Sequence, residues 1–123
     1  MKLRDNLYSI SDVQQAPESV TYSILLNKDC IIYQAHFPGM PITPGVCIVQ
    51  IAEELLSDYL QKPLQLTSIR NAKFLSILKP TDHVVLVHLK GIKEAEGKVT
   101  AQAVIDDNEG TVYAKISFTC NDV

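Results

Sequence analysis

The sequence predicts an α+β fold in which an antiparallel sheet packs against one long helix, and three observations lead to this prediction. Several stretches alternate apolar and polar residues with the period of two that is typical of a strand with one buried face. Only one stretch, about residues 44–60, has the wide apolar arc of a buried helix. The order is strands, then this helix, then about four more strands, which indicates an α+β arrangement.

Composition places the chain among ordinary globular proteins. Its 123 residues are enough for one core and no linker or repeat divides them, so we expect a single domain over residues 1–123. The 11 Lys and Arg residues are dispersed and the net charge is −3, which argues against a nucleic-acid partner. No apolar run approaches the roughly 20 residues that a membrane helix needs, and the N-terminus lacks a secretion signal. We therefore expect a cytoplasmic protein without a membrane partner.

The expected strands follow from the alternation. The first clear strand is VTYSILLN, residues 20–27, and its apolar face consists of Val20, Tyr22, Ile24 and Leu26. KVTAQAVID (98–106) and TVYAKISFTC (111–120) alternate in the same way, and the turn-forming residues DDNEG between them favour an antiparallel hairpin. HVVLVHLKG (83–91) is more apolar and is expected in the middle of the sheet. LTSIRNAKFLSIL (66–78) is extended, with a weaker alternation.

A single long helix is predicted over about residues 44–60. Thr43 is a good N-cap, Pro44 suits the first helical position, and Pro63 prevents continuation. Its apolar arc consists of Ile48, Val49, Ile51, Ala52, Leu55, Leu56, Tyr59 and Leu60. The remaining polar stripe consists of Gln50, Glu53, Glu54, Ser57 and Asp58. So wide an arc fits a helix wrapped by a curved sheet better than a helix on a surface.

A histidine stands in the loop before this helix. His36 follows CIIYQA (30–35), which is expected to be a strand, and two prolines and a glycine stiffen the turn after it. The loop leads to a helix N-terminus, whose free amides and dipole can stabilise developing negative charge. Gly45 has no side chain, so a ligand can approach its backbone N–H closely. A base and an oxyanion site would then be neighbours.

The run HFPGMPITPGV, residues 36–46, resembles the signature of the 3-hydroxyacyl-acyl-carrier-protein dehydratases, which have the hot-dog fold. An HFPG-x-P loop followed by PGV or PGC and a central helix is typical of that family, and KFLSILKPTD (73–82) is similar to a further segment of it. The similarity runs from about Val20 to Cys120. Family members usually begin with a helix and a segment like PHRYPFLLVD, and this chain has neither.

The resemblance implies roles for the loop and the start of the helix. His36 is the expected base that removes the proton beside the thioester carbonyl, and the Gly45 N–H polarises that carbonyl. In the family, an acid on the central helix of the other subunit protonates the departing 3-hydroxyl, and its position is occupied here by Gln50. The expected substrate-binding residues are Phe37, Pro38, Gly39, Pro44, Val46 and Glu54. The implied partners are an acyl carrier protein or coenzyme A thioester and a second copy of the chain, in a homodimer or a dimer-based higher oligomer.

Because glutamine has no proton to give at neutral pH, three functions stay open. A dehydratase would shuttle the proton on His36 while Gln50 orients the hydroxyl, or would use Glu53 or Glu54, one turn further along the stripe. A hot-dog acyl thioesterase would use Gln50 to position an attacking water. A non-catalytic subunit would bind acyl chains or support an active homologue. The loop, turn and helix start occur together, which favours the dehydratase of fatty-acid or related acyl-chain synthesis, giving a trans-2-enoyl thioester.

No metal or organic cofactor is expected. The three cysteines, Cys30, Cys47 and Cys120, have neither the spacing of a redox pair nor that of zinc ligands, so we expect reduced and mostly buried thiols. Elimination of water beside a thioester needs only a base, an acid and a group that polarises the carbonyl.

Overall fold

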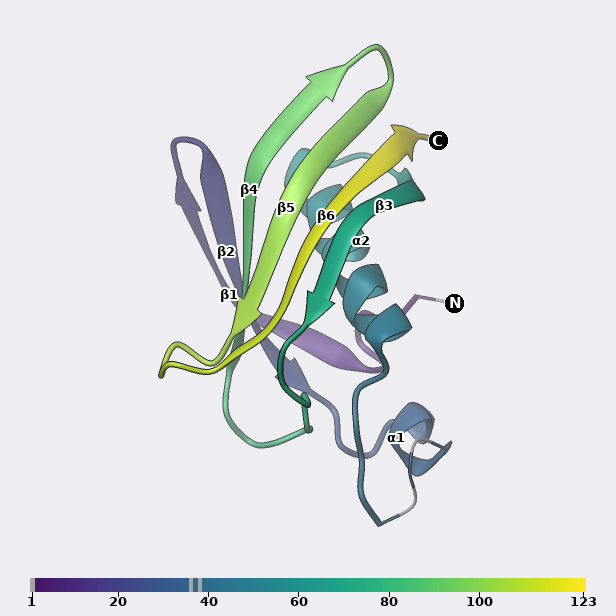
Figure 1. The fold of residues 1–123 in the computed structure, drawn as a ribbon, viewed down its shortest axis with the longest axis vertical. Helices are drawn as coiled ribbons and strands as arrows, with labels where there is room; N and C mark the ends of the chain where they lie inside the picture. The colour runs from purple at the N-terminus through teal and green to yellow at the C-terminus, as the bar shows by residue number, and fades with distance from the viewer. Residues whose placement is uncertain (1, 36, 38) are drawn as a thin grey trace.

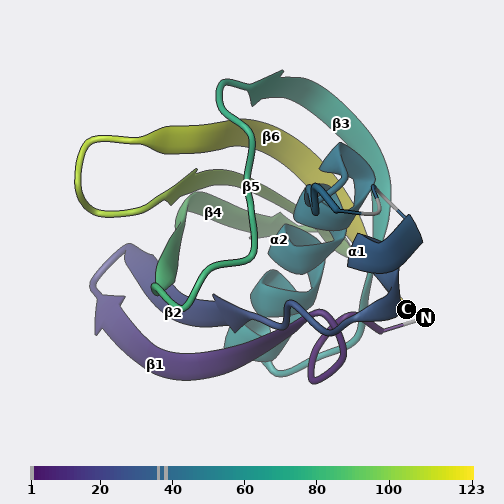
Figure 2. The same ribbon diagram turned by 90° about the horizontal axis from the view of Figure 1, so that it is seen from below.

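The computed structural model describes residues 2–35, 37 and 39–123. Within them, six strands form one antiparallel sheet in the order β1-β2-β4-β5-β6-β3. The elements in chain order are β1 (Tyr8–Ala16), β2 (Ser19–Leu26), α1 (Ile31–Ala35), α2 (Gly45–Leu60), β3 (Leu64–Phe74), β4 (Val85–Ala95), β5 (Lys98–Asp106) and β6 (Val112–Asp122). The sheet curls around α2, which lies in its concave face (Figures 1 and 2). The predicted α+β arrangement, with one helix wrapped by a curved sheet, is confirmed.

The apolar arc of α2 packs against alternate residues of the strands. The buried residues of the helix are Cys47, Ile48, Val49, Ile51, Ala52, Leu55 and Leu56. The facing buried residues of β5 and β6 are Val99, Ala101, Ala103, Ile105, Ala114, Ile116, Phe118 and Cys120. All belong to one core cluster, and each large aliphatic side chain buried there contributes about 1.5–3 kcal/mol. The period-two pattern therefore identified the inner face of these strands correctly.

The predicted hairpin of β5 and β6 is also confirmed. The two strands pair antiparallel from Lys98 opposite Asn121 to Asp106 opposite Val112. In the turn, the Asp107 carboxylate accepts hydrogen bonds from the backbone N–H groups of Glu109 at 2.8 Å and Thr111 at 3.0 Å. These bonds lower the pKa of Asp107 because they stabilise its charged form.

Residues 30–35 form a short helix, and the strand that the sequence predicted there is wrong. The N–H of Cys30 donates to the Asn27 carbonyl, and the N–H of Tyr33 donates to the Cys30 carbonyl, both at 3.0 Å. The Asn27 side chain also accepts the N–H of Asp29 at 3.1 Å, so a turn leads directly into α1. Tyr33 is buried while Ile31 is exposed. A short apolar run does not by itself distinguish a strand from a helix. Here the preceding turn directs residues 31–35 into a helix.

The first residues form an edge of the sheet that the sequence did not predict. β1 pairs antiparallel with β2, from Tyr8 opposite Leu26 to Ala16 opposite Ser19. Most β1 side chains are exposed on both faces, so the strand has no period-two pattern. The segment is nevertheless anchored, since Leu3, Leu7 and Tyr8 are buried in the core.

The end of α2 is tied to the ends of two strands. Gln61 adopts the left-handed conformation (φ 55°) and ends the helix shortly before Pro63. Lys62 Nζ then pairs with Glu94 Oε1 at 2.8 Å and with Asp122 Oδ1 at 2.9 Å. The hydrogen bonds to Glu94 and Asp122 raise the pKa of Lys62.

Among the described residues, no helix is both long and apolar enough to cross a membrane.

Candidate active site

The segment before α2 is fixed by Thr43, although not as the predicted N-cap. The capping residue is Pro44, α2 begins at Gly45, and among the described residues no side-chain hydrogen bond caps this end of the helix. Thr43 is buried, its hydroxyl shares a 2.8 Å hydrogen bond with the Tyr33 hydroxyl, and its N–H donates to the Leu78 carbonyl at 2.9 Å. Because Tyr33 engages this hydroxyl, it does not cap the first amides. The predicted N-cap is wrong, whereas the predicted start of the helix is confirmed within one residue.

The first amides of α2 lie at the mouth of the candidate site. The first hydrogen bonds inside the helix run from the N–H groups of Cys47 and Ile48 to the Pro44 carbonyl, at 3.0 and 3.1 Å. The N–H groups of Gly45 and Val46 come before them, where a helix offers no carbonyl partner. The positive end of the helix dipole lies at the same place. This end of α2 can therefore stabilise a carbonyl oxygen that gains negative charge.

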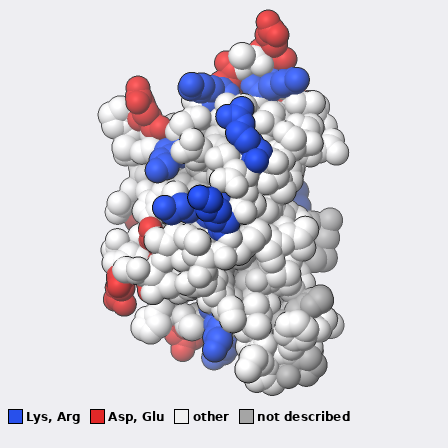
Figure 3. All heavy atoms as spheres, viewed as in Figure 1, with Lys and Arg blue, Asp and Glu red and all other residues white. Residues whose placement is uncertain are grey.

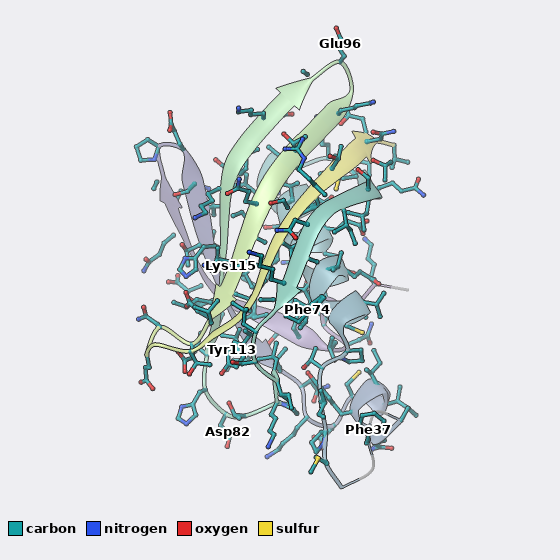
Figure 4. The ribbon with its side chains drawn as sticks, viewed as in Figure 1. Phe37, Phe74, Asp82, Glu96, Tyr113 and Lys115 are labelled. Atoms are coloured by element: carbon teal, nitrogen blue, oxygen red, sulfur yellow. The ribbon has the colours of Figure 1, made fainter. Side chains whose placement is uncertain are left out.

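Gly45 leaves room for an aromatic ring that lies against the start of α2. A Cβ added at this position would stand 3.0 Å from Cζ of Phe74 and 3.2 Å from its Cε1. Figure 4 shows Phe74 at the end of β3, beside the first turns of α2. The ring is about half exposed, so it covers part of the first turn of α2 while one side of it faces the solvent.

An apolar pocket of about 380 Å³ opens between α2 and β3. Its lining consists of Gly45, Val46, Val49, Gln50, Glu53, Leu66, Ile69, Ala72 and Phe74. Only Gln50 and Glu53 bring polar side chains into it, and the first amide of α2 lies at one end. An apolar cleft with a few polar groups at fixed places is the usual form of a site for a small molecule.

A second, larger hollow of about 770 Å³ lies beside the polar stripe of α2. The N-terminal residues Lys2 and Arg4 form one side of it, and the residues after the helix, from Gln61 to Gln65, form another. Gln50 and Glu53 line both hollows, whereas Glu54 lines only the larger one. Gln50 and Glu53 therefore stand on the wall between the apolar pocket and the polar hollow.

The Glu54 carboxylate is held by four hydrogen-bond donors. Oε2 accepts the backbone N–H of Leu3 at 2.8 Å and Nε2–H of Gln50 at 2.9 Å. Oε1 accepts the backbone N–H of Arg4 and the hydroxyl of Tyr8, both at 2.9 Å. Burial and the neighbouring Glu54 charge raise the pKa of Tyr8, so its hydroxyl keeps its proton and remains a donor. Glu54 thus fastens the N-terminal residues to α2.

Asp58 fastens the same segment one turn further on. Its Oδ1 accepts a 2.8 Å hydrogen bond from Nη1 of Arg4, and its Oδ2 accepts the Tyr22 hydroxyl at 2.6 Å. The bond to Asp58 raises the pKa of Arg4, and burial together with Asp58 raises the pKa of Tyr22. The polar stripe of α2 is therefore covered by structural hydrogen bonds along much of its length.

Glu53 and Glu54, equivalent in the sequence, occupy different surroundings. Glu53 accepts the backbone N–H of Leu66 at 2.7 Å through Oε2 and lines the apolar pocket. Both oxygens of Glu54 already accept two hydrogen bonds each, and this side chain faces the polar hollow. Of the two carboxylates, Glu53 is thus the one that reaches the pocket.

The loop before the site is described only in part. His36 and Pro38, the predicted base and a predicted substrate-binding residue, lie outside the described residues. Between Phe37 and Met40 two backbone hydrogen bonds of 3.2 and 2.9 Å close a tight turn, in which Gly39 adopts φ +79°. The Phe37 side chain is 56% exposed, so it presents an apolar surface to the solvent beside α1 (Figure 4).

The cysteines take no part in this site. All three thiols are free and buried, as predicted. Cys47 lies in the first turns of α2, where a helix dipole would favour a thiolate, but burial raises its pKa instead. Burial also raises the pKa of Cys120 to about 12. The described residues contain no cluster of side chains suited to a metal ion.

The sequence did not identify the β3 wall of the pocket, namely Leu66, Ile69, Ala72 and Phe74. Two irregularities interrupt the pairing of β3 with β6, between Leu66 and Ser68 and between Ile69 and Asn71. A bulge adds one residue to a strand and so shifts the side chains to the opposite parity. This is why the alternation over 66–78 is weak, although the inward residues do share one face.

The fold and the pocket together define a class of protein. An antiparallel sheet wrapped around one long helix, with a pocket at the helix start, is the hot-dog fold. Residues 12–116 match the model of the ApeI-like family, described as ApeI dehydratase, and the chain belongs to this family. The predicted resemblance to hot-dog dehydratases is confirmed.

Individual relatives agree with this assignment. The chain is 31% identical over 121 residues to the 3-hydroxyacyl-[acyl-carrier-protein] dehydratase FabZ of Lactiplantibacillus plantarum, covering 87% of this chain and 82% of the relative. It is 30% identical over 103 residues to FabZ of Fusobacterium nucleatum, covering 79% and 70%. Both relatives bear the name of a dehydratase.

Solved structures share the fold at lower identity. The dehydratase heterocomplex ApeI:P from Xenorhabdus doucetiae matches with a TM-score of 0.71 at 18% identity, covering 91% of this chain and 96% of that one. A thioesterase from Haemophilus influenzae matches with a TM-score of 0.68 at 17% identity, covering 97% and 80%. At these identities the likeness shows the hot-dog fold alone.

Substitution of Gly45 by alanine should weaken acyl binding. The new methyl group would stand 3.0 Å from the Phe74 ring, which must then move along the pocket wall. We expect the affinity for an acyl-pantetheine ligand to fall by about tenfold, within the roughly 1–3 kcal/mol typical of overpacking. Calorimetric titration measures this loss, and the double substitution with Phe74→Leu should restore most of it. Unchanged affinity in Gly45→Ala would show that the ring moves without affecting the pocket.

Tyr33 should make stability depend on alkaline pH. Burial raises the pKa of Tyr33 to about 12 from 10.0, so the folded state favours the protonated phenol. Its contribution is complete below pH 10 and is lost as the pH rises from about 10 to about 12. Tyr33→Phe should lower the free energy of unfolding by about 0.5–1.5 kcal/mol at neutral pH, because the bond to Thr43 is lost.

The same substitution should also make the alkaline decline less steep. Urea unfolding between neutral pH and about pH 11 measures both effects. Thr43→Val is the matched control, because it removes the hydrogen bond and leaves the titrating phenol in place. Equal slopes in wild type and Tyr33→Phe would contradict the assigned contribution.

Proposed function

We propose that this chain binds 3-hydroxyacyl thioesters and eliminates water from them to give trans-2-enoyl thioesters. One observation carries the proposal: the first amide of α2 and the Gln50 side chain open on the same apolar pocket, in a member of a dehydratase family. The acyl chain lies along the apolar wall of β3, and the thioester carbonyl lies at the Gly45 N–H.

The proposed reaction begins at the carbon beside the carbonyl. His36 removes a proton from this carbon, and the electron pair moves toward the carbonyl oxygen, where the Gly45 N–H and the helix dipole stabilise the charge. The pair then forms the carbon–carbon double bond while the bond from carbon 3 to its hydroxyl oxygen breaks. Gln50 holds the hydroxyl, which needs one proton to leave as water.

That proton comes from a group other than Gln50, because an amide has none to give. His36 holds a proton after the first step and is our first candidate for returning it. Glu53 is the second, because of the two neighbouring carboxylates it lines the pocket. A positioned general acid typically contributes about 10²- to 10⁴-fold, or roughly 3–5 kcal/mol, so we expect slower turnover than in a protein with a dedicated acid.

The carrier of the acyl chain is proposed to be an acyl carrier protein, with coenzyme A as the alternative. Lys and Arg side chains spread over the outer face of the sheet, while Asp and Glu lie toward its rim (Figure 3). Lys73 of β3 stands directly opposite Lys115 of β6, where two like charges repel each other. An anionic carrier would relieve this repulsion, and Lys73 is next to Phe74 of the pocket. The setting would be fatty-acid or related acyl-chain synthesis in the cytoplasm.

The assembly is proposed to be a homodimer or a dimer-based oligomer. Within the described residues β3 lies at one edge of the sheet, and its residues Ile69 and Phe74 are about half exposed. Pairing this edge with a second copy would cover both and bring a second loop to the pocket.

Gln50→Glu tests the proposed chemistry. The introduced carboxyl would lie beside Glu54, and this like charge would raise its pKa and favour the protonated form that an acid needs. We expect dehydration of a 3-hydroxyacyl thioester to accelerate by at least about tenfold, up to the 10²–10⁴-fold of a typical general acid. Mass spectrometry of the acyl products measures the rate, and Gln50→Met, which has no proton to give, is the control.

The same assay separates the competing functions. Loss of water from the 3-hydroxyacyl substrate, or hydration of the trans-2-enoyl substrate, supports the proposal. Release of free acid would assign a thioesterase, in which Gln50 positions water for attack on the thioester. Absence of any product from 3-hydroxyacyl, enoyl and saturated thioesters would assign a binding or supporting subunit.

The size of the protein in solution tests the proposed assembly. Light scattering on a concentration series should give at least twice the 13.6 kDa of one chain. A mass of one chain at all concentrations, together with retained dehydration, would show that the site functions without a second copy.

A further inference from the structure

Two contacts between α2 and β3 define the ends of the apolar pocket. At one end Gly45 of α2 lies against Phe74 of β3, where an added Cβ would stand 3.0 Å from Cζ of the ring. At the other end Oε2 of Glu53 accepts the backbone N–H of Leu66 at 2.7 Å. The helix and the strand therefore run side by side in opposite directions, as Figure 1 shows, and the pocket between them extends from Gly45 to Glu53.

The two ends of the pocket differ in charge, and the walls between them are mostly apolar. The start of α2 is the positive end of the helix dipole, whereas Glu53 brings a carboxylate. The residues between the ends are Gln50 and the apolar Val46, Val49, Ile69 and Ala72. In the proposed complex the thioester carbonyl lies at the start of α2, so the hydrocarbon chain follows these walls toward Glu53.

The distance between the ends limits the length of the chain. Glu53 follows Gly45 by eight residues of α2, which rise about 12 Å along the helix axis. An extended hydrocarbon chain advances by less than one bond of about 1.5 Å per carbon. With van der Waals contact to the carboxylate allowed for, roughly eight carbons fit between the Gly45 N–H and Glu53.

A longer chain would leave the apolar walls at Glu53. This residue stands on the wall that the apolar pocket shares with the larger hollow. That hollow is lined mainly by polar and charged side chains, among them Lys2, Arg4, Asp58 and Lys62. Methylene groups that pass Glu53 would therefore enter a polar space and would take water from a carboxylate, which is unfavourable without a compensating hydrogen bond.

The Glu53 carboxylate is held in place by the backbone of β3. It accepts the Leu66 N–H just before the irregularity between Leu66 and Ser68 in the pairing with β6. Rotation of the Glu53 side chain would leave this part-buried N–H without its partner, which costs free energy. The carboxylate therefore stays at the end of the pocket when a chain approaches it.

We propose that Glu53 is a specificity-determining residue, which ends the apolar pocket and restricts the acyl chain to roughly eight carbons. This inference rests on the binding step of the proposed function, because it assumes that an acyl thioester lies in the pocket with its carbonyl at Gly45. It gives Glu53 a role different from proton donation, which would require the carboxyl group at carbon 3.

The affinity for acyl ligands should therefore depend on chain length in two stages. Each methylene group buried along the walls should raise the affinity about fourfold. Further methylene groups gain nothing once the chain reaches Glu53, and contact with the carboxylate lowers the affinity. The ratio of the affinities for a long and a medium chain isolates this effect, because changes at the carbonyl end alter both affinities equally.

Titration calorimetry with three matched ligands tests the inference. The probes are butanoyl-, octanoyl- and dodecanoyl-pantetheine, each with the thioester replaced by an amide that is not turned over. The wild type should bind the octanoyl probe most tightly. Glu53→Met replaces the carboxylate by an apolar side chain of similar length, so the dodecanoyl probe should then bind more tightly than the octanoyl probe, by at least about the fourfold of one buried methylene group.

Glu54→Gln is the matched control. Glu54 is the neighbouring carboxylate but lines only the polar hollow, so the preference for the octanoyl probe should persist in this variant. Glu53→Gln keeps an oxygen that can accept the Leu66 N–H, and it serves if Glu53→Met does not fold. It should raise the ratio of dodecanoyl to octanoyl affinity by at least about twofold. Tighter binding of the dodecanoyl probe by the wild type, or a wild-type ratio in the Glu53 variants, would overturn the inference.

The dehydration assay separates this inference from the proposed function. A wild type that prefers the octanoyl probe but eliminates no water would support the inference and overturn the proposed reaction. Equally fast dehydration of 3-hydroxyoctanoyl and 3-hydroxydodecanoyl thioesters would support the reaction and overturn the inference. Equal slowing of both substrates in Glu53→Gln would assign Glu53 to proton donation instead. Absence of binding by all three probes would overturn both proposals.

Discussion

The burial of α2 in the concave face of the sheet is the constraint on which the rest of the structure depends. The helix buries Cys47, Ile48, Val49, Ile51, Ala52, Leu55 and Leu56, so the strands must curve to cover more than half of its circumference. Only one narrow polar stripe remains outside the core. Every polar side chain that α2 offers for chemistry lies on that stripe, beside the edge strand β3 and the N-terminal residues.

Neighbouring residues of this stripe have different tasks because their surroundings differ. Glu54 and Asp58 bind the N-terminal segment through Leu3, Arg4 and Tyr8, and Asp58 also binds Tyr22 of β2. Glu53 and Gln50 reach the wall of the apolar pocket. The edge that β1 forms, which has little apolar pattern of its own, is thus coupled through Glu54 to the amide in the pocket. The Glu54 carboxylate therefore both holds the N-terminal residues on α2 and hydrogen-bonds the Gln50 side chain.

The proposed reaction needs two kinds of group, one that polarises the carbonyl and one that donates a proton. In the proposed site, the start of α2 stabilises the charge on the thioester carbonyl, and it does so with backbone N–H groups, which side-chain substitutions do not remove. Proton donation depends instead on a side chain, and in our proposal Gln50 cannot supply the proton, so His36 or Glu53 must. A site of this kind keeps carbonyl polarisation and acyl binding even where proton transfer is slow, which is why dehydration, hydrolysis and simple binding lie chemically close to one another.

The sequence by itself determined the strands with one buried face and the single long helix, because burial on one face leaves a periodic pattern, and the motif of residues 36–46 indicated the family. It failed for residues 30–35, where a turn at Asn27 produced a helix, and for β1, which is exposed on both faces. Only the tertiary structure decided that Tyr33 takes the Thr43 hydroxyl, that Phe74 lies over Gly45, and that Glu54 holds Gln50. These contacts join residues from different elements, and their partners depend on how the sheet curves and where β3 bulges, which no local pattern encodes.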